Sequence, residues 1–167
     1  QSEAAFAEIY DRYALRVNAY CKTILDNDEL AEDIFQETFL KFYQFARSEK
    51  TNSGIIGFLI TIARNLCLNA KRDIKHNISL DSIDLAFEGE QSYEDKETSS
   101  LVIYGLDLID KEYKEAIILR FFNDLSYKEI GKIMNITDAR ARYLVFTGKQ
   151  RLKEVLKPYF EDYKNIK

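Results

Sequence analysis

The chain has 167 residues, of which 46% are hydrophobic and 31% are charged, and its formal net charge is -4. This apolar content is enough to build folded cores and excludes a disordered chain. Because the net charge is negative, any contact with nucleic acid must come from local basic patches, and we expect such binding to be weak and salt-sensitive. No apolar run approaches the ~20 residues needed to cross a bilayer, so the chain is not expected to be membrane-inserted.

The two cysteines, Cys21 and Cys67, lie far apart in the sequence and inside apolar stretches with helical spacing. They lack the C-x-x-C spacing that is typical of zinc sites and redox motifs. We therefore expect buried, reduced thiols rather than a disulfide or a metal site, which is the pattern of a cytoplasmic protein.

Hydrophobic periodicity predicts three helices in the first part of the chain. The first carries apolar residues three or four positions apart over 6–24, and the polar residues 26–28 end it and cap the next. The second runs over about 29–47. The third begins near Ile55 or Gly57 and ends in the charged run KRDIK. These three helices can close one core.

The second predicted helix is richer in aromatic residues than a small core needs. Phe35, Phe39 and Phe42 form a wide apolar band on it. Two interpretations stay open at this point: all of these rings belong to the core, or some of them face a protein partner.

Residues 77–100 are acidic, with Lys96 as their single basic residue, and show no sustained helical spacing. This composition predicts a flexible linker. Helical spacing resumes over 101–109 and again, after the predicted N-cap Asp110, over 113–122. We find no strand-like alternation of useful length. The predicted fold class is therefore all-α: two small helical bundles joined by a flexible acidic linker.

The second bundle contains the sequence pattern of a helix-turn-helix. Ser126 and Glu129 form an S-x-x-E capping box at the start of a short helix. Asn135 follows where a left-handed C-cap is often needed, and Thr137 is the predicted N-cap of a longer basic helix. In such a unit the second helix normally enters the major groove of DNA. Pro158, near the end of that helix, is expected to kink or end it.

The third predicted helix has a basic and amide-rich surface as well. By charge alone this surface fits a solvated helix and a DNA contact about equally well. Its residues are Arg64, Asn65, Asn69, Lys71, Arg72 and Lys75.

Three segments, taken in order, resemble motifs of the extracytoplasmic-function sigma factors of bacterial RNA polymerase, a branch of the sigma-70 family. DELAEDIFQETFLKF and FLITIARNLCLNAKRD resemble two segments of region two, and LSYKEIGKIMNIT resembles a segment of region four. The resemblance covers nearly the whole chain. It implies a region-two domain over 1–76, the acidic linker over 77–100 and a region-four helix-turn-helix domain over 101–167.

Carried over residue by residue, the resemblance implies three binding surfaces. Core RNA polymerase would be bound by Asp33, Gln36, Glu37 and Phe39. The minus-ten promoter element would be bound by Arg64, Asn65, Asn69, Lys71, Arg72 and Lys75. The minus-thirty-five element would be bound by Ser126, Tyr127, Arg140, Arg142, Tyr143, Lys149 and Arg151. Amide and guanidinium groups suit unstacked bases, which offer free hydrogen-bonding edges and ring faces.

Several residues depart from the family pattern. Phe58 stands for the usual Trp, and Asn69 for the usual Asp. The second helix of the helix-turn-helix is called the recognition helix. In it, Leu144 and Thr147 occupy positions where the pattern has Arg. Gly148 lies inside the same helix, where it costs up to about 1 kcal/mol relative to Ala, and we interpret it as a point of close backbone approach.

The resemblance implies an alternative sigma factor that directs core RNA polymerase to promoter DNA and assists DNA opening. It implies no enzymatic activity, cofactor, metal or small-molecule substrate, a cytoplasmic location, and an anti-sigma protein, membrane-bound in the family, as a further partner. An alternative is a sigma-like decoy or adaptor that binds an anti-sigma protein without recognising promoters. The altered recognition helix favours the decoy, whereas the basic third helix speaks against it.

A third class is a metal enzyme, because Glu29, Asp33 and Glu37 are spaced four apart on one predicted helix. Carboxylate-bridged metal bundles usually need a Glu-x-x-His motif from each of two helices. The chain has one histidine, His76, which is expected to be a solvated residue at a helix end. The residue inventory therefore argues against this class.

Overall fold

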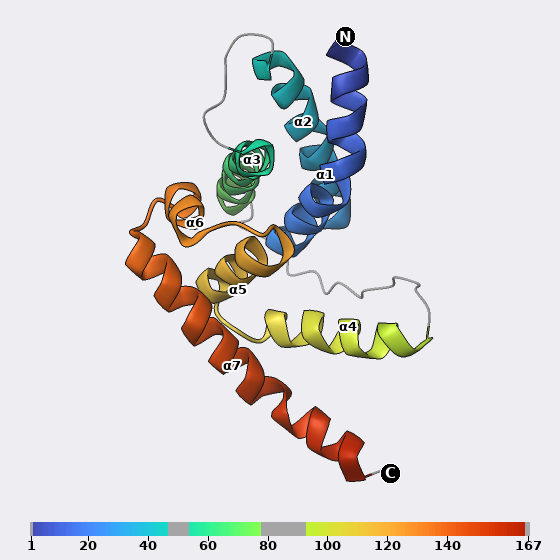
Figure 1. Cartoon of the computed structure of the whole chain (residues 1–167), viewed down its shortest axis with the longest axis vertical. Helices are drawn as coiled ribbons and strands as arrows, with labels where there is room; N and C mark the ends of the chain where they lie inside the picture. Colours follow the sequence, from blue (N-terminus) through green and yellow to red (C-terminus); the bar gives the residue numbers. More distant parts are fainter. Residues whose placement is uncertain (1, 47–53, 78–92, 166–167) are drawn as a thin grey trace. The chain divides into compact units, whose positions relative to one another are not determined.

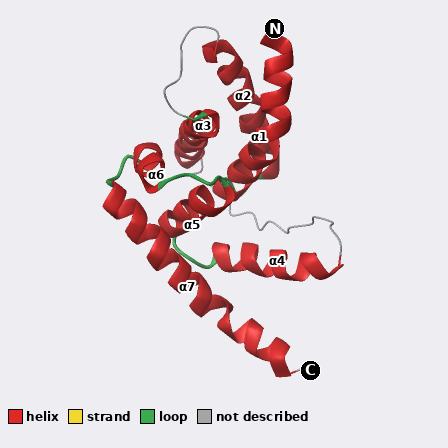
Figure 2. Ribbon diagram, in the orientation of Figure 1, coloured by secondary structure: helices red, strands yellow, loops and turns green. Residues whose placement is uncertain are grey.

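The computed structural model describes residues 2–46, 54–77 and 93–165, and every regular element in these ranges is a helix (Figures 1 and 2). The all-α fold class is confirmed. In chain order the elements are α1 (Ser2–Ile24), α2 (Asp28–Ala46), α3 (Ile55–Asn77), α4 (Tyr93–Asp107), α5 (Lys111–Ile117), the π-helical turn η1 (Ile118–Phe122), α6 (Tyr127–Met134) and α7 (Asp138–Asn165).

These helices divide into two compact units. The first holds α1, α2 and α3, and the second holds α4, α5, η1 and α7. Helix α6 is one continuous helix, but the division between the units falls within it. Its residues up to Gly131 belong to the second unit, and Lys132–Asn135 belongs to the first. Of the predicted linker, residues 78–92 lie outside the described residues. Helix α4 begins at Tyr93 rather than at 101, so the end of the acidic segment is helical.

The first unit is a three-helix arrangement in which α1, α2 and α3 all pack against one another. The break between α1 and α2 is fixed locally, because the Leu30 N–H donates to Asn27 Oδ1 at 2.8 Å and so caps α2 as predicted. The apolar stripes of the three helices meet in the core. Its most deeply buried residues include Val17, Tyr20, Cys21, Ala31, Leu59, Ile60, Ala63 and Cys67.

The aromatic band of α2 belongs almost entirely to this core. Phe35, Phe39 and Phe42 are each no more than 5% exposed. Phe39 meets Tyr10 of α1 with ring centroids 4.9 Å apart in an edge-on arrangement, which aromatic pairs prefer. Phe45 is the exception on α2, at 52% exposed. The core interpretation therefore holds for these three rings.

Both cysteines are fully buried free thiols, as predicted. A hydrogen bond between Cys21 of α1 and Cys67 of α3, together with burial, raises the pKa of the Cys21 thiol far above its usual value. Because the thiolate is the reactive form, we expect neither cysteine to react with the aromatic disulfide DTNB in the folded chain. Both should react once urea unfolds the protein. Rapid labelling of either thiol under native conditions would contradict this packing.

The second unit is built along α7, against which both α4 and α5 pack. Its core cluster consists of Leu106, Ile109 and Ile117, with Val102, Tyr113, Leu152 and Val155 packed around it. Helix α7 continues through Pro158 to Asn165, so the helix does not end at the proline. The missing N–H removes one hydrogen bond from a helix of 28 residues, which its other hydrogen bonds and packing outweigh.

The predicted helix over 113–122 changes its winding halfway. After α5 the chain continues as η1, and the Asn123 N–H donates to the carbonyl oxygen of Ile118 at 3.2 Å, a bond that spans five residues. Such π-helical turns are rare, and hydrophobic spacing does not reveal them.

Candidate nucleic-acid and polymerase interfaces

The start of α6 is held by the predicted capping box. The Ser126 N–H donates to Glu129 Oε2 at 2.8 Å, and the Glu129 N–H donates to Ser126 Oγ at 3.2 Å. The Ser126 hydroxyl also donates to Glu129 Oε2 at 2.7 Å. Both the N–H and the hydroxyl of Ser126 are therefore engaged by Glu129, and the role of Ser126 in binding the minus-thirty-five element stays a prediction.

The turn between α6 and α7 has the predicted geometry. Asn135 has φ 57°, the left-handed conformation of a helix C-cap. The Ile136 N–H donates to the carbonyl oxygen of Gly131 at 2.9 Å, which closes the end of α6. The Arg140 N–H then donates to Thr137 Oγ1 at 3.1 Å and caps α7. Helices α6 and α7 thus form the helix-turn-helix that the sequence indicates.

The inner side of α7 explains one of the family departures. Leu144 is 1% exposed and Val145 is 2% exposed, and the fully buried Ala141 lies on the same side. A charged side chain at position 144 would therefore be buried without water, which is costly. Leu144 is a core residue here rather than a lost DNA contact.

The outer side of α7 carries a residue that sequence reasoning missed. Phe146 is 66% exposed, and together with Ala139, Arg142 and Tyr143 it lines a hollow of about 590 Å³. The helical spacing of the buried residues could have predicted this exposure. Val145 and Gly148 lie on the buried side of α7, and Phe146 does not fall on that side.

Aromatic rings orient two of the predicted basic contacts. The Arg142 guanidinium lies 5.1 Å from the centre of the Tyr127 ring on α6, and Lys149 Nζ lies 5.2 Å from the centre of the Phe121 ring. Arg120 contacts the same Tyr127 ring at 5.0 Å. Such cation–π contacts hold a side chain in place while leaving its charge able to interact with an anion.

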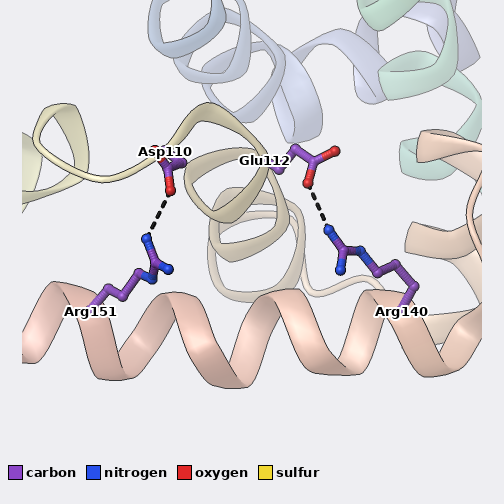
Figure 3. Close-up of polar contacts among 4 residues, drawn as sticks. All are labelled: Asp110, Glu112, Arg140 and Arg151. Carbon is purple, nitrogen blue, oxygen red and sulfur yellow. Dashed lines mark hydrogen bonds and ion pairs between the residues drawn. The ribbon is translucent and has the colours of Figure 1, made fainter.

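Two other predicted arginines of α7 point toward α5 instead (Figure 3). Arg140 Nη2 lies 3.0 Å from Glu112 Oε2, and Arg151 Nη1 lies 2.8 Å from Asp110 Oδ2. Sequence reasoning did not anticipate these ion pairs. They join residues that are far apart in the chain.

Tyr143 is tied to the same helix. A hydrogen bond between Tyr113 of α5 and Tyr143 lowers the pKa of Tyr143 and raises that of Tyr113. Gly148 permits this close packing, because a Cβ atom added to it would lie 3.0 Å from both Tyr113 Cβ and Ile117 Cδ1. The close approach predicted at Gly148 is confirmed.

On α3 the structure brings together part of the predicted minus-ten surface. Asn65, Asn69 and Arg72 are exposed and follow one another at four- and three-residue steps, so they share one side of the helix. Arg64 and Lys71 are half-buried and engaged in other interactions. Lys75 belongs to α3, but its side chain lies outside the described part of the structure.

On α2 the predicted polymerase surface separates into exposed and buried members. Asp33, Gln36 and Glu37 are exposed on neighbouring turns. Phe39 is 3% exposed and packs against Phe35 with ring centroids 5.3 Å apart. Phe39 therefore supports this surface from the core, and the polar residues form the part that a partner can reach.

Within the described ranges, no three His, Cys, Asp or Glu side chains gather as a metal site would require. In the same ranges, no helix combines the length and apolar character needed to cross a membrane.

The sequence matches the model of Sigma-70 region 2 over residues 9–76 and that of Sigma-70 region 4 over residues 106–152. It is 29% identical over 150 residues to the ECF RNA polymerase sigma factor SigM of Bacillus subtilis, covering 87% of this chain and 91% of SigM. It is 28% identical over 158 residues to the RNA polymerase sigma factor CarQ of Myxococcus xanthus, covering 93% of this chain and 91% of CarQ.

The fold is similar to that of the sigma factor RpoE in its co-crystal structure with the anti-sigma factor NepR from Bartonella quintana. The TM-score is 0.74 at 21% identity, with 92% of this chain and 97% of the other covered. The chain belongs to the sigma-70 family and, within it, to the extracytoplasmic-function (ECF) sigma factors.

Proposed function

We propose that the chain is an alternative sigma factor that brings core RNA polymerase to specific promoters and helps to open them. The observation that carries this proposal is the pairing, in one chain, of two surfaces of different chemistry. The region-two unit presents an exposed amide and arginine stripe on α3. The region-four unit presents a helix-turn-helix whose second helix has a basic outer side.

The α3 stripe suits single-stranded DNA. We assign Asn65, Asn69 and Arg72 to the separated strand of the minus-ten element, with Arg64, Lys71 and Lys75 supporting phosphate contacts. Asparagine offers a donor and an acceptor to an exposed base edge, and a guanidinium plane stacks on an unpaired base. These groups favour the open over the closed duplex because their partners are free only when the strands separate.

The outer side of α7 suits the major groove of the minus-thirty-five element. We assign Arg142 and Lys149 to this element first, because their charges face away from the core of the unit. We also assign to this element a second set of residues, whose hydroxyl and guanidinium groups suit contacts to the DNA backbone: Ser126, Tyr127, Arg140, Tyr143 and Arg151.

The remaining assignments concern the partners. Asp33, Gln36 and Glu37 on α2 are assigned to core polymerase, where exposed carboxylates speed encounter with a basic surface and fix register. Polymerase carries out the chemistry, so the chain needs no catalytic residue and acts in the cytoplasm, where polymerase and DNA are found. We propose a region-two domain over 1–76, a linker over 77–100 whose last part is helical from Tyr93, and a region-four domain over 101–167. An anti-sigma protein is a further proposed partner, as RpoE of Bartonella quintana has one in its co-crystal structure.

In vitro transcription with core polymerase tests the proposal. We expect this chain to give transcripts with defined start sites on a genomic template, and sequencing of these transcripts identifies the promoter elements. Core polymerase without the chain is the control. A chain that binds core polymerase and an anti-sigma protein, yet gives no specific start sites, would instead fit the decoy alternative.

A further inference from the structure

Asp110 is placed to cap α5 but does not do so. It is the N-cap residue, and its side chain makes no capping hydrogen bond. An aspartate at this position usually accepts a hydrogen bond from a backbone N–H of the first turn. Here its carboxylate accepts a hydrogen bond from Arg151 of α7 at 2.8 Å (Figure 3). The carboxylate of Asp110 therefore links the start of α5 to α7 instead of capping α5.

Glu112 makes the matching contact about three turns earlier along α7. Its carboxylate accepts a hydrogen bond from Arg140 Nη2 at 3.0 Å (Figure 3). Arg140 and Arg151 are eleven residues apart in the sequence, which is about three helical turns, so both lie on the same side of α7. Two carboxylates at the start of α5 thus hold two arginines of the recognition helix.

Each arginine is held on a second side by an aromatic ring. The Arg151 guanidinium lies 4.6 Å from the centre of the Tyr113 ring, and that of Arg140 lies 5.2 Å from the centre of the Tyr143 ring. The arginine side chains nevertheless stay 47% and 48% exposed. An ion pair with this exposure is weak and open to competition by another anion.

We propose that Asp110 and Glu112 act as internal substitutes for DNA phosphates, which hold Arg140 and Arg151 in the free chain and yield them to the DNA backbone when α7 binds a promoter. The inference rests on the proposed role of α7 in minus-thirty-five binding. A carboxylate and a phosphate both present oxygen pairs that match the guanidinium fork. While the internal pairs persist, two phosphate contacts are missing, and the affinity of the free chain for duplex DNA is lower.

The test is the duplex affinity of the full-length chain after replacement of Glu112 by glutamine. Glu112→Gln keeps the shape of the side chain and removes its charge. The probe is a fluorescein-labelled DNA duplex about three helical turns long, titrated at salt concentrations between about 50 and 200 mM. We expect binding about two- to fivefold tighter than that of the unmodified chain. The slope of log K against log salt should steepen by about 0.9, the value for one added phosphate contact.

Two controls separate release of an arginine from a simple change in net charge. Glu154→Gln makes the same charge change at an exposed position of α7 outside both ion pairs. Arg140→Ala removes the arginine that Glu112 holds, so in that background Glu112→Gln should strengthen binding no more than Glu154→Gln does. Asp110→Asn should act in the same way through Arg151. Circular dichroism spectra check that each variant keeps its helix content.

The inference is overturned if Glu112→Gln strengthens binding no more than Glu154→Gln does, or strengthens it equally in the Arg140→Ala background. Weaker binding by Glu112→Gln, or no duplex binding by any variant at low salt, overturns it as well. Failure of the proposed function looks different: transcription would show no specific start sites, while the effect of Glu112→Gln on duplex binding would remain.

Discussion

Replacing Asn65, Asn69 and Arg72 together with alanine is expected to reduce open-complex formation about 100-fold or more, while the affinity for core RNA polymerase stays unchanged. A stacking or hydrogen-bonding contact to an unpaired base contributes about 1–3 kcal/mol, so the loss of two such contacts is enough for this factor. All three side chains are exposed on α3, so their removal leaves the core of the first unit intact. Permanganate reactivity of unpaired thymines measures the opening.

A second triple variant provides the matched control. Asp33, Gln36 and Glu37 are equally exposed, but on α2. Their replacement by alanine should lower the affinity for core polymerase and leave opening unchanged once polymerase is saturated. We therefore expect the α3 variant to lose opening but keep polymerase binding, and the α2 variant to lose polymerase binding but keep opening. An equal loss of binding and opening in the α3 variant would show that the stripe contacts polymerase rather than the separated strand.

The largest stability effect is expected at Gly148. A Cβ atom at this position would already lie 3.0 Å from Tyr113 Cβ and Ile117 Cδ1. Alanine gains up to about 1 kcal/mol of helix propensity, which offsets part of the crowding. Valine adds two further methyl groups against α5, and overpacking of this kind costs about 3 kcal/mol. We expect Gly148→Val to lower the melting temperature of the second unit by about 12 °C or more.

Thermal melting followed by circular dichroism measures this shift. Gln150→Val is the control, because residue 150 is exposed on the same helix, so the variant introduces a β-branched residue into α7 without the clash. Equal shifts for the two variants would mean that α5 and α7 are not in close contact at Gly148. Since the ion pairs of Arg140 and Arg151 depend on that contact, Gly148→Val should also alter duplex binding.

The helix ends of the second unit could be predicted from sequence because their signals are local. The capping box joins Ser126 and Glu129, three residues apart, and the left-handed Asn135 directly follows the last residue of α6. In each case the residue that carries the signal also makes the contact. The helix-turn-helix could therefore be predicted from the sequence alone.

The partners of the recognition-helix arginines could not be predicted in this way. Arg140 and Glu112 are 28 residues apart, and Arg151 and Asp110 are 41 residues apart. A basic helix indicates affinity for anions, but the pattern does not say whether the anion is a phosphate or a carboxylate of the same chain. Motif comparison likewise counted Leu144 as a missing contact, because a motif does not record which side of α7 is buried.

The two sides of α7 are under different physical constraints. Leu144 and Gly148 are fixed by the fit against the rest of the unit, whereas Arg142 and Phe146 can change without loss of buried contacts. Under the proposed role of α7 in minus-thirty-five binding, a duplicated copy of this protein could acquire different promoters through substitutions at Arg142 and Phe146. Substitutions at these two exposed positions therefore carry little cost in stability, whereas substitutions of Arg140, Tyr143 or Arg151 also remove contacts with α5 or its N-cap.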